Sequence, residues 1–302
     1  MEILRTNDLT KNYKSQIAVN KVNMVINEGD IYGFIGENGA GKTTLIRMVS
    51  GLIKPTSGDY SLFEKGGLNH SSASHIGAVV ETPSLYLNMT AMENLKTQAY
   101  IIGLKGDLNK RFIDSLNLVG LSEVIESKKK VKNFSLGMKQ RLSIALTLLS
   151  DPKFLLLDEP MNGLDPEGIV SMRNLIINLN EERGITFLIS SHILEELSRV
   201  ATRYGFIHKG VLIKEISKEE LISQGKKHTV MVVDQPEETL QVLKSIGIEQ
   251  VEIEGHAVKV YDEIIISDIV LALSQKGIKI TNIIQKEKSI EEFYLELMGG
   301  EA

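Results

Sequence analysis

The chain has 302 residues, of which 42% are hydrophobic and 24% charged, with a formal net charge of −5 and no cysteine. This composition excludes a disordered or fibrous protein, and the missing cysteine excludes a disulfide framework and any thiolate metal site or nucleophile. The acidic balance disfavours a protein that binds nucleic acid or anionic lipid along a basic surface, and at about 150 residues per domain the length indicates two domains.

No segment predicts insertion in a membrane. The first residues, MEILRTNDLTKNYK, contain no apolar stretch of the kind found in signal peptides. The longest apolar runs, such as 154–157 and 264–266, are far shorter than the roughly 18 residues that cross a bilayer. We therefore expect a soluble protein that reaches a membrane only through a partner.

The N-terminal part of the chain is predicted to be rich in strands. Residues 3–35 have the pattern of short strands with polar turns, and the last of them, 30–35, is an apolar strand. This strand leads into a glycine-rich loop and then into a helix over 43–49. A strand, a loop and a helix in this order are typical of a nucleotide-binding α/β domain.

Helical spacing dominates the next part of the chain. Apolar residues recur three and four positions apart between 84 and 127 and again over 142–149, which predicts a helical subdomain at about 84–150. Beyond it, continuous apolar runs at 154–157 and 186–189 are typical of buried parallel strands.

The sequence pattern changes after about residue 222, where the polar segment 225–228 (GKKH) predicts a linker. Beyond it the patterns predict, in order, strand 229–233, helix 237–245, strands 250–254 and 258–261, helix 267–275, strand 278–285 and a last helix from 289. This βαββαβ order is that of a ferredoxin-like α+β domain. We therefore predict an α/β domain over 1–222 and a small accessory domain over 228–302.

The segment between strand 30–35 and helix 43–49 matches the phosphate-loop pattern G-x-x-x-x-G-K-[ST]. Glycines allow successive backbone N–H groups to point at a phosphate, and the helix N-terminus adds the positive end of its dipole. We expect Lys42 to reach the β- and γ-phosphates and the Thr43 hydroxyl to bind Mg²⁺. The predicted nucleotide-binding residues of this loop are Gly36, Glu37, Asn38, Gly39, Ala40, Gly41, Lys42, Thr43 and Thr44.

Two adjacent carboxylates, Asp158 and Glu159, end the apolar strand 154–157. Such a pair is most often a solvated turn, but here it follows a buried type of strand in a chain with a phosphate loop. Because side chains alternate along a strand, we expect the two carboxylates to point in different directions. Asp158 is predicted to hold Mg²⁺ through water, and Glu159 to face the attacking water as a general base.

Three further segments complete an ordered set of motifs, namely NFSLGMKQR at 133–141, NGLD at 162–165 and SSH at 190–192. With them, residues 2–220 resemble the ATP-binding subunit of an ABC transporter. The resemblance implies a P-loop NTPase fold, ATP and Mg²⁺ as cofactors, ATP hydrolysis, and a head-to-tail dimer with a second ATP-binding subunit. It also implies a transmembrane permease subunit that holds this subunit at the cytoplasmic face of the membrane.

The resemblance implies roles for single residues. Ser135 and Gly137 match the signature that acts on the γ-phosphate held by the opposite subunit, and Ser135 also suits the N-cap of the helix that follows. Asp165 matches the aspartate at the dimer seam, or is simply a turn residue before Pro166. His192 matches the switch histidine, which contacts the γ-phosphate and the attacking water and which we count as catalytic with Glu159 and Lys42.

The adenine base is expected to meet residues from the N-terminal strands. Tyr13 fits the aromatic residue that stacks on adenine, and Val19 fits a residue that packs beside the base. The remaining five histidines have no spacing typical of metal ligands, and we predict that they lie at the surface: His70, His75, His208, His228 and His256.

The chain departs from the family pattern at three positions. Leu136 and Met138 differ from the usual signature, and because Leu136 replaces a glycine we expect an altered fit with the Ser135 contact retained. Where most members have a glutamine that touches Mg²⁺, this chain has Glu81, which is either a metal ligand or a solvated side chain. These departures and the C-terminal domain resemble the bacitracin-resistance and lantibiotic-immunity branch of bacterial exporters.

Two other classes of function are weighed against transport. A soluble ABC-type ATPase that acts on DNA or ribosomes is disfavoured by the single phosphate loop, the absence of sustained heptads and the acidic balance. A regulatory module that binds nucleotide without turnover is disfavoured by the presence of both Glu159 and His192. The transported compound is not encoded here, because the resemblance places its contacts in the membrane subunit.

Overall fold

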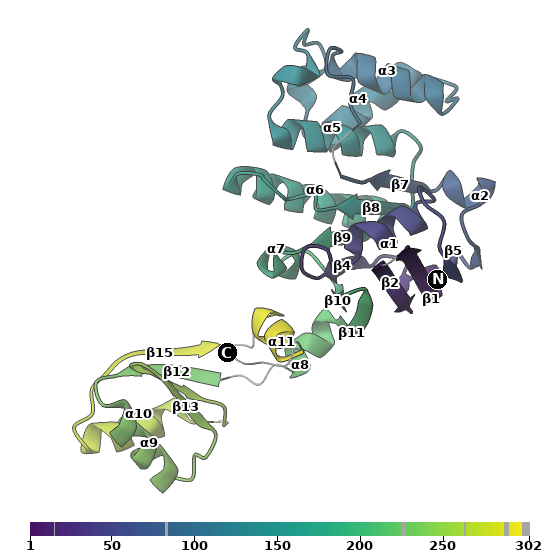
Figure 1. The fold of residues 1–302 in the computed structure, drawn as a ribbon. Helices are drawn as coiled ribbons and strands as arrows, with labels where there is room; N and C mark the ends of the chain where they lie inside the picture. Colours follow the sequence, from purple (N-terminus) through teal and green to yellow (C-terminus); the bar gives the residue numbers. More distant parts are fainter. Residues whose placement is uncertain (15, 82–83, 225–227, 263, 287–289, 298–302) are drawn as a thin grey trace. The chain divides into compact units, whose positions relative to one another are not determined.

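The computed structural model describes residues 1–302 except 15, 82–83, 225–227, 263, 287–289 and 298–302. The chain forms two compact units, Met1–Lys218 and Glu219–Ala302 (Figure 1). The division lies a few residues before the boundary predicted at 222 and assigns nearly all of helix α8 (Lys218–Gln224) to the second unit. Most of the predicted linker, residues 225–227, and the predicted start of the last helix at 289 lie outside the described residues.

The strands of the first unit form two sheets. The smaller sheet has the order β2-β1-β5-β6, and β3 also pairs with β1. The larger sheet has the order β11-β10-β4-β9-β8-β7. Their bounds are β1 (Glu2–Tyr13), β2 (Gln16–Val22), β3 (Val25–Asn27), β4 (Ile31–Ile35), β5 (Ser57–Leu62), β6 (Lys65–Gly66), β7 (Ile76–Val79), β8 (Phe154–Asp158), β9 (Thr186–Ser191), β10 (Arg203–His208) and β11 (Val211–Ser217).

The first strand is longer than the sequence predicts. Strand β1 has 12 residues, and irregularities in its pairing with β2 and β5 fall near Asp8, whose φ is 46°. Bulges of this kind interrupt the two-residue alternation from which strands are predicted, so one bent strand has the pattern of several short ones.

The larger sheet positions the site. Strands β10, β4, β9, β8 and β7 are neighbours in a parallel arrangement, and every residue of β4 and β8 is buried. One face packs against helix α1 (Lys42–Val49), whose apolar residues belong to the same core cluster as Phe34, Leu156 and Leu188. Because parallel strands end at one edge, the residues that follow β4, β8 and β9 meet there.

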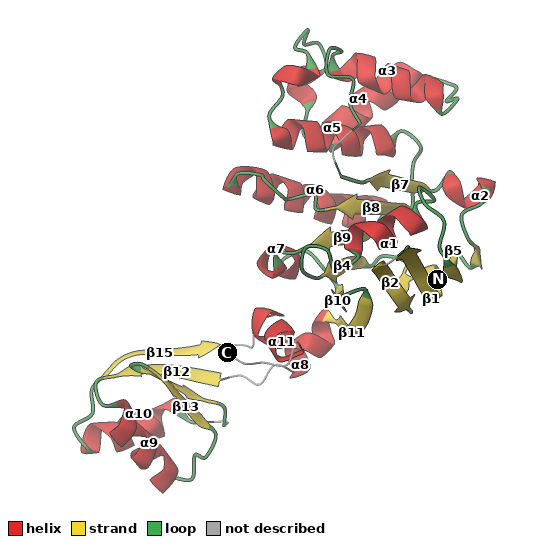
Figure 2. Ribbon diagram, viewed as in Figure 1, coloured by secondary structure: helices red, strands yellow, loops and turns green. Residues whose placement is uncertain are grey.

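Three helices of the first unit lie together, apart from the other helical segments. Helices α3 (Ala91–Ile101), α4 (Leu108–Leu118) and α5 (Leu136–Leu148) form a separate group that follows β7 in the chain (Figure 2). The remaining helical segments are α2 (His70–Ala73), η1 (Ser122–Val124), η2 (Val131–Asn133), α6 (Pro166–Arg183) and α7 (Leu194–Ser198). A capping box of Thr90 and Glu93 begins α3, which is why the helix begins where it does.

The second unit has its own sheet and core. Its elements are β12 (His228–Val233), α9 (Pro236–Ser245), β13 (Val251–Glu254), β14 (Ala257–Val260), α10 (Ile266–Gln275), β15 (Ile280–Lys286) and α11 (Ile290–Leu297). The strand order is β13-β14-β12-β15 with antiparallel neighbours, which is the order that a split βαβ arrangement requires. Residues of α9 and α10, such as Leu243 and Leu273, share one core cluster with Met231 and Val258 of the sheet.

One histidine is misplaced by the sequence analysis. His228 is buried, with only 4% of its surface exposed, and its ring lies 5.3 Å from that of Tyr261 between centroids. The prediction of a surface position was wrong because it includes His228 in the polar linker 225–228, whereas in the structure His228 is the first residue of β12. Within the ranges that the structure describes, no helix is long and apolar enough to cross a membrane.

Candidate functional site

The loop between β4 and α1 has a backbone shape that only glycine permits at two positions. A Cβ atom on Gly36 would lie 2.3 Å from the carbonyl oxygen of Ile207, and one on Gly41 would lie 2.4 Å from that of Ala18. Gly41 also has a φ of 110° and, as the N-cap of α1, provides no side-chain cap. The first turn of α1 carries no acidic residue, so the positive end of the helix dipole is available to an anion.

Lys42 places a buried positive charge inside this loop. Its side chain is only 4% exposed, and Nζ donates to the carbonyl oxygens of Gly36 at 2.6 Å and Glu37 at 3.1 Å. Nζ also lies 3.3 Å from Oε1 of Glu159. The buried ammonium group is therefore held by two carbonyl oxygens of the loop and lies next to one carboxylate oxygen of the residue that follows β8.

Thr43 and Asp158 form an oxygen-rich pair at the edge of the sheet. Thr43 Oγ1 donates to Asp158 Oδ2 at 2.8 Å, and the Asp158 residue is 8% exposed. Hydroxyl and carboxylate oxygens are the ligands that Mg²⁺ prefers, and Mg²⁺ is usually held by one or two carboxylates together with substrate phosphates. The oxygen atoms of this pair therefore fit the predicted metal. The described part of the chain contains no group of three or more His, Asp or Glu side chains that could hold a metal ion.

Ser190, for which the sequence analysis predicted no role, connects the two acidic residues. Its hydroxyl donates to Asp158 Oδ1 at 2.6 Å and accepts from the backbone N–H of Glu159 at 3.0 Å. The signal was present in the sequence, because Ser190 follows an apolar strand that is predicted to run parallel to the strand ending at Asp158. Polar residues at the ends of neighbouring parallel strands lie close together.

The side chain of Glu159 points toward His192. Nδ1 of His192 lies 2.8 Å from Glu159 Oε2, and the Glu159 backbone has a φ of 50°, in the left-handed region. Asp158 and Glu159 do have different partners, but the expected cause was wrong: strand β8 ends at Asp158, and the left-handed turn, rather than strand alternation, separates the two side chains. A strained backbone of this kind persists only where the surroundings hold it.

A third carboxylate lies close to this pair. Glu196 in α7 is half-buried, and its pKa is raised above the ordinary glutamate value, first by burial and then by the negative charge of Glu159. The positive charges of His192 and Arg173 oppose the increase. The sequence analysis did not single out Glu196.

A cleft of about 350 Å³ opens beside the loop. Its lining residues are Tyr13, Gln16, Ala18, Asn38, Gly39, Gly41, Lys42, Thr43, Thr44 and Glu159. Tyr13 is 45% exposed at the cleft, and Lys11 Nζ lies over its ring, 5.3 Å from the ring centre. Val19, by contrast, is fully buried in the core, so the structure corrects its prediction, and Ala18 lines the cleft instead.

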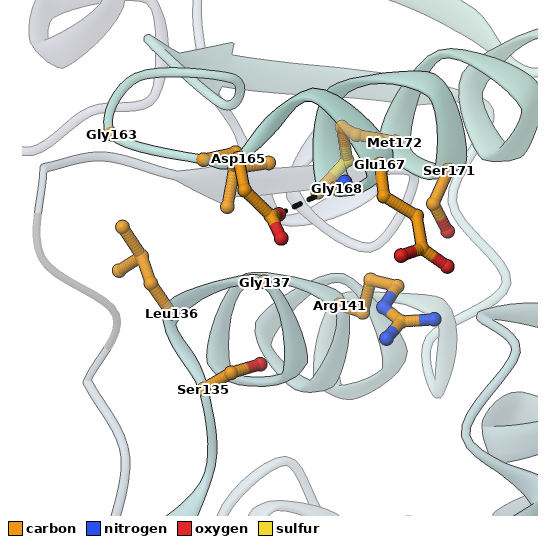
Figure 3. A pocket seen from close by; sticks show the side chains of 11 residues that line it. Ser135, Leu136, Gly137, Arg141, Gly163, Asp165, Glu167, Gly168, Ser171 and Met172 are labelled. Carbon is orange, nitrogen blue, oxygen red and sulfur yellow. Dashed lines mark hydrogen bonds between the residues drawn. The ribbon is translucent and has the colours of Figure 1, made fainter.

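The signature residues line a different cavity, of about 440 Å³, between α5 and the start of α6 (Figure 3). Ser135 caps α5, with its hydroxyl accepting from the N–H of Met138 at 3.2 Å. Asp165 caps α6 in the same way through Gly168 at 3.0 Å. Gly137 lies on the cavity wall with them. The two cavities share no lining residue, so within one chain the signature is not part of the phosphate-loop cleft.

Two of the three departures from the family pattern, Leu136 and Glu81, have defined neighbours. Leu136 is 45% exposed and extends over the loop after β8, where its Cδ2 would be 3.1 Å from a Cβ placed on Gly163. Glu81 is 58% exposed at its side chain, does not line the cleft, and pairs with Arg47 through Oε1 and Nη2 at 2.5 Å. Its backbone also has a positive φ, of 58°.

Known proteins share both the sequence and the fold of this chain. A family model described as ABC transporter matches residues 19–162. The bacitracin transport ATP-binding protein BcrA of Bacillus licheniformis is 43% identical over 99% of this chain and 98% of its own length. The lantibiotic transport ATP-binding protein SrtF of Streptococcus pyogenes is 42% identical over 70% of this chain and 90% of its own length.

Among solved structures, the ATP-binding cassette MJ0796, a dimer in a post-hydrolysis state bound to ADP and Pi, superimposes with a TM-score of 0.64. The alignment has 26% sequence identity and covers 72% of this chain and 99% of that one. The share of this chain that it covers is close to the extent of the first compact unit.

Proposed function

The chain belongs to the ABC transporter family, in which its relatives are ATP-binding subunits, and from this premise we propose that it binds and hydrolyses Mg²⁺-ATP to drive export through a separate transmembrane subunit. The observation that supports hydrolysis best is the continuous set of contacts from Lys42 to Glu159 to His192 at the end of β8. A site that only binds nucleotide needs the loop and its lysine, but not a carboxylate oriented by an imidazole.

The proposed mechanism depends on positioning and charge rather than on a covalent intermediate. The glycine-rich loop and the N-terminus of α1 hold the phosphates, and Lys42 Nζ neutralises charge on them. Thr43 and Asp158 would hold Mg²⁺, and the metal would supply positive charge against the phosphate oxygens.

Glu159 accepts a proton from the attacking water, and His192 orients the Glu159 carboxylate from the opposite side. The aromatic ring of Tyr13 stacks on the adenine base at the mouth of the cleft. Glu81 would offer a further oxygen to the metal if its side chain turned from Arg47 toward the cleft.

The active unit is proposed to be a head-to-tail dimer. Ser135, Gly137 and Asp165 line a cavity that is separate from the phosphate-loop cleft, so a single chain cannot bring both to one nucleotide without rearrangement. A two-fold dimer solves this, because each signature then meets the partner's loop. The dimeric form of the MJ0796 cassette supports this arrangement.

Transport is proposed to act on a peptide antibiotic or a related compound. The relatives matched over most of their length are transport proteins for bacitracin and for a lantibiotic. Such a subunit is peripheral at the cytoplasmic face, held there by its permease. Co-purification with a six-span membrane protein encoded beside it tests the pairing, and failure of every such protein to associate contradicts it.

The two-subunit site can be tested by mixing variants. Lys42→Ala removes the phosphate contact, and Ser135→Trp blocks the signature; each homodimer then has two defective sites. A mixed dimer recovers one intact site, because the defective loop of one chain and the defective signature of the other fall in the same site. We expect each mixed dimer to hydrolyse ATP at about half of the wild-type rate per dimer, if the sites act independently. No recovery with confirmed mixed dimers contradicts the shared site.

A nucleotide-binding module without turnover, or a soluble ATPase acting on nucleic acid or ribosomes, is supported less well. The contact of Glu159 with His192 has no purpose in the first. The second is not suggested by relatives that match the whole chain and are transport subunits.

A further inference from the structure

A lysine lies over one face of the Tyr13 ring. Lys11 Nζ is 5.3 Å from the ring centre, within the roughly 6 Å over which an aromatic face attracts an ammonium group. The two residues are two positions apart on β1, which places their side chains on the same side of the strand. A base that stacks on Tyr13 therefore has the opposite face of the ring.

Lys11 is next to the phosphate-loop cleft without being part of its wall. Tyr13 lines the cleft, and Lys11 does not. Tyr13 is also 45% exposed, and an exposed side chain loses conformational freedom when a ligand immobilises it. Among the hydrogen bonds, ion pairs and ring contacts of the described residues, the contact that holds the Tyr13 side chain is the one with Lys11. The orientation of the ring thus depends on where the ammonium group is held.

The ammonium group of Lys11 is anchored on the segment 54–56. Its Nζ donates to the carbonyl oxygen of Lys54 at 2.6 Å. The same segment binds the end of β1 twice more: the N–H of Asn12 donates to Thr56 Oγ1 at 3.0 Å, and the N–H of Thr56 donates to the carbonyl oxygen of Thr10 at 2.8 Å. Lys11 is therefore fixed at its backbone and at the tip of its side chain.

These contacts connect the ring to the helix that begins in the phosphate loop. The segment 54–56 follows α1, and the N–H of Ile53 donates to the carbonyl oxygen of Arg47 in α1 at 3.2 Å. On the other side, Ala18 of β2 lines the cleft, and its carbonyl oxygen would be 2.4 Å from a Cβ placed on Gly41. The Tyr13 ring and the phosphate loop thus have a defined separation within one rigid set of contacts.

We propose that Lys11 is a positioning residue for the nucleotide: it holds the Tyr13 ring from the face opposite the adenine base, so that the ring is already oriented for stacking. This deepens the proposed function and rests on it. A ring that is held in place loses less conformational entropy when the base binds. The effect is confined to the base, because Lys11 does not line the cleft that holds the phosphates.

The test compares a ligand that has a base with one that has none. Lys11→Met keeps the length of the side chain but removes the charge and the hydrogen-bond donor. In the presence of Mg²⁺, the full-length variant is expected to bind the non-hydrolysable analogue AMP-PNP about twofold to fivefold more weakly, the usual range for a cation–π contact at an exposed site. The affinity for inorganic tripolyphosphate should stay unchanged. Isothermal titration calorimetry measures both ligands without turnover.

A double-variant cycle shows whether Lys11 acts through the ring. In the Tyr13→Leu background, Lys11→Met should have no further effect on AMP-PNP binding, because no ring is left to hold. Lys11→Arg keeps both the charge and the donor, so it should retain most of the wild-type affinity. Lys129→Met is the matched control: Lys129 Nζ lies 5.6 Å from the ring centre of Phe134, outside the cleft, so its loss should leave both affinities unchanged.

Four results would overturn the inference. An equal loss of AMP-PNP and tripolyphosphate affinity would mean that Lys11 acts on the phosphates by its charge alone. Tighter AMP-PNP binding by Lys11→Met would mean that Lys11 covers the face that the base needs. An undiminished effect in the Tyr13→Leu background, or wild-type AMP-PNP affinity of Lys11→Met, would mean that the lysine does not position the ring.

The same titrations separate this inference from the proposed function. Lys42→Ala should weaken both ligands, and unchanged affinities would contradict a nucleotide site at the phosphate loop. Tyr13→Leu should weaken AMP-PNP alone, and an unchanged affinity would contradict the proposed adenine stack. If both of these variants behave as expected while Lys11→Met binds AMP-PNP like the wild type, the nucleotide site stands and only the role of Lys11 is refuted.

Discussion

Nδ1 of His192 lies 2.8 Å from Oε2 of Glu159, although the two residues are 33 positions apart in the chain. The contact is made because β8 and β9 are parallel neighbours, so the residues that follow them meet at one edge of the sheet. The other oxygen of Glu159 lies 3.3 Å from Lys42 Nζ. The carboxylate of Glu159 is thus contacted from two sides, by Lys42 and by His192.

Glu159→Gln is expected to lower the rate of ATP hydrolysis by about 10²- to 10⁴-fold while ATP-analogue binding is retained, because the amide keeps the shape but cannot accept the proton. Phosphate release and equilibrium binding are measured in parallel. Glu195→Gln is the control, since Glu195 is an exposed glutamate on α7 that pairs with Arg199. Phosphate release by Glu159→Gln at the wild-type rate would contradict the assignment of Glu159 as the general base.

His192→Ala is expected to lower the rate of ATP hydrolysis because the Glu159 carboxylate loses the imidazole that orients it. We expect no further effect of the substitution that does not involve Glu159. The double variant with Glu159→Gln should then be no slower than Glu159→Gln alone, because residues that act as a unit are not additive. Single-turnover rates of the four proteins of the cycle provide the measurement. Multiplicative losses would show that His192 acts elsewhere.

Ser190→Ala is expected to lower the free energy of unfolding by about 1–3 kcal/mol, because the buried Asp158 loses a hydrogen-bond donor and the N–H of Glu159 loses an acceptor. Metal affinity should fall as well, since the Asp158 carboxylate loses the hydrogen bond from Ser190 and keeps the one from Thr43. Denaturant unfolding provides the measurement. Ser150→Ala serves for comparison, because Ser150 Oγ donates only to a carbonyl oxygen in its own turn, and equal losses for the two serines would contradict the argument.

Gly36→Ala is expected to abolish nucleotide binding, because its Cβ would lie 2.3 Å from a backbone oxygen that cannot move without the strand β10. Gly39→Ala meets no atom within 4 Å and carries only the strain of its φ of 83°, on the order of 1 kcal/mol. Fluorescent-nucleotide titration of both variants, after a check of folding by circular dichroism, compares them. Equal affinities would mean that the loop adjusts.

Glu196→Gln is expected to stabilise the protein at pH values above 4.5, the ordinary glutamate pKa. At lower pH the change should alter the stability little. The folded-state pKa of Glu196 is raised, so the wild type loses stability as pH rises from the unfolded-state pKa through the folded-state pKa. The glutamine has no such loss. Because the side chain is half-exposed, the gain in Tm at pH 7 is on the order of 1 °C. A gain that is larger at pH 4 than at pH 7 contradicts the assignment.

The sequence by itself determined the parts of this protein that are written in local patterns. The phosphate loop, the Asp158–Glu159 pair and the order of the later motifs follow from residue types at fixed spacing, and the atoms around Gly36 and Gly41 leave no room for a Cβ there. The six elements of the second unit from β12 to β15 were likewise predicted in the right order, because each is a short periodic segment with its own turn signals.

Only the tertiary structure decided which residues meet. Ser190 reaches Asp158, Arg47 reaches Glu81, and Ala18 instead of Val19 lines the cleft, because strand ends and helix faces bring together positions that no local spacing relates. The left-handed turn at Glu159 and the burial of His228 also escaped the sequence analysis. Periodicity shows that a side chain lies on a strand or a helix, but its partner depends on which elements become neighbours.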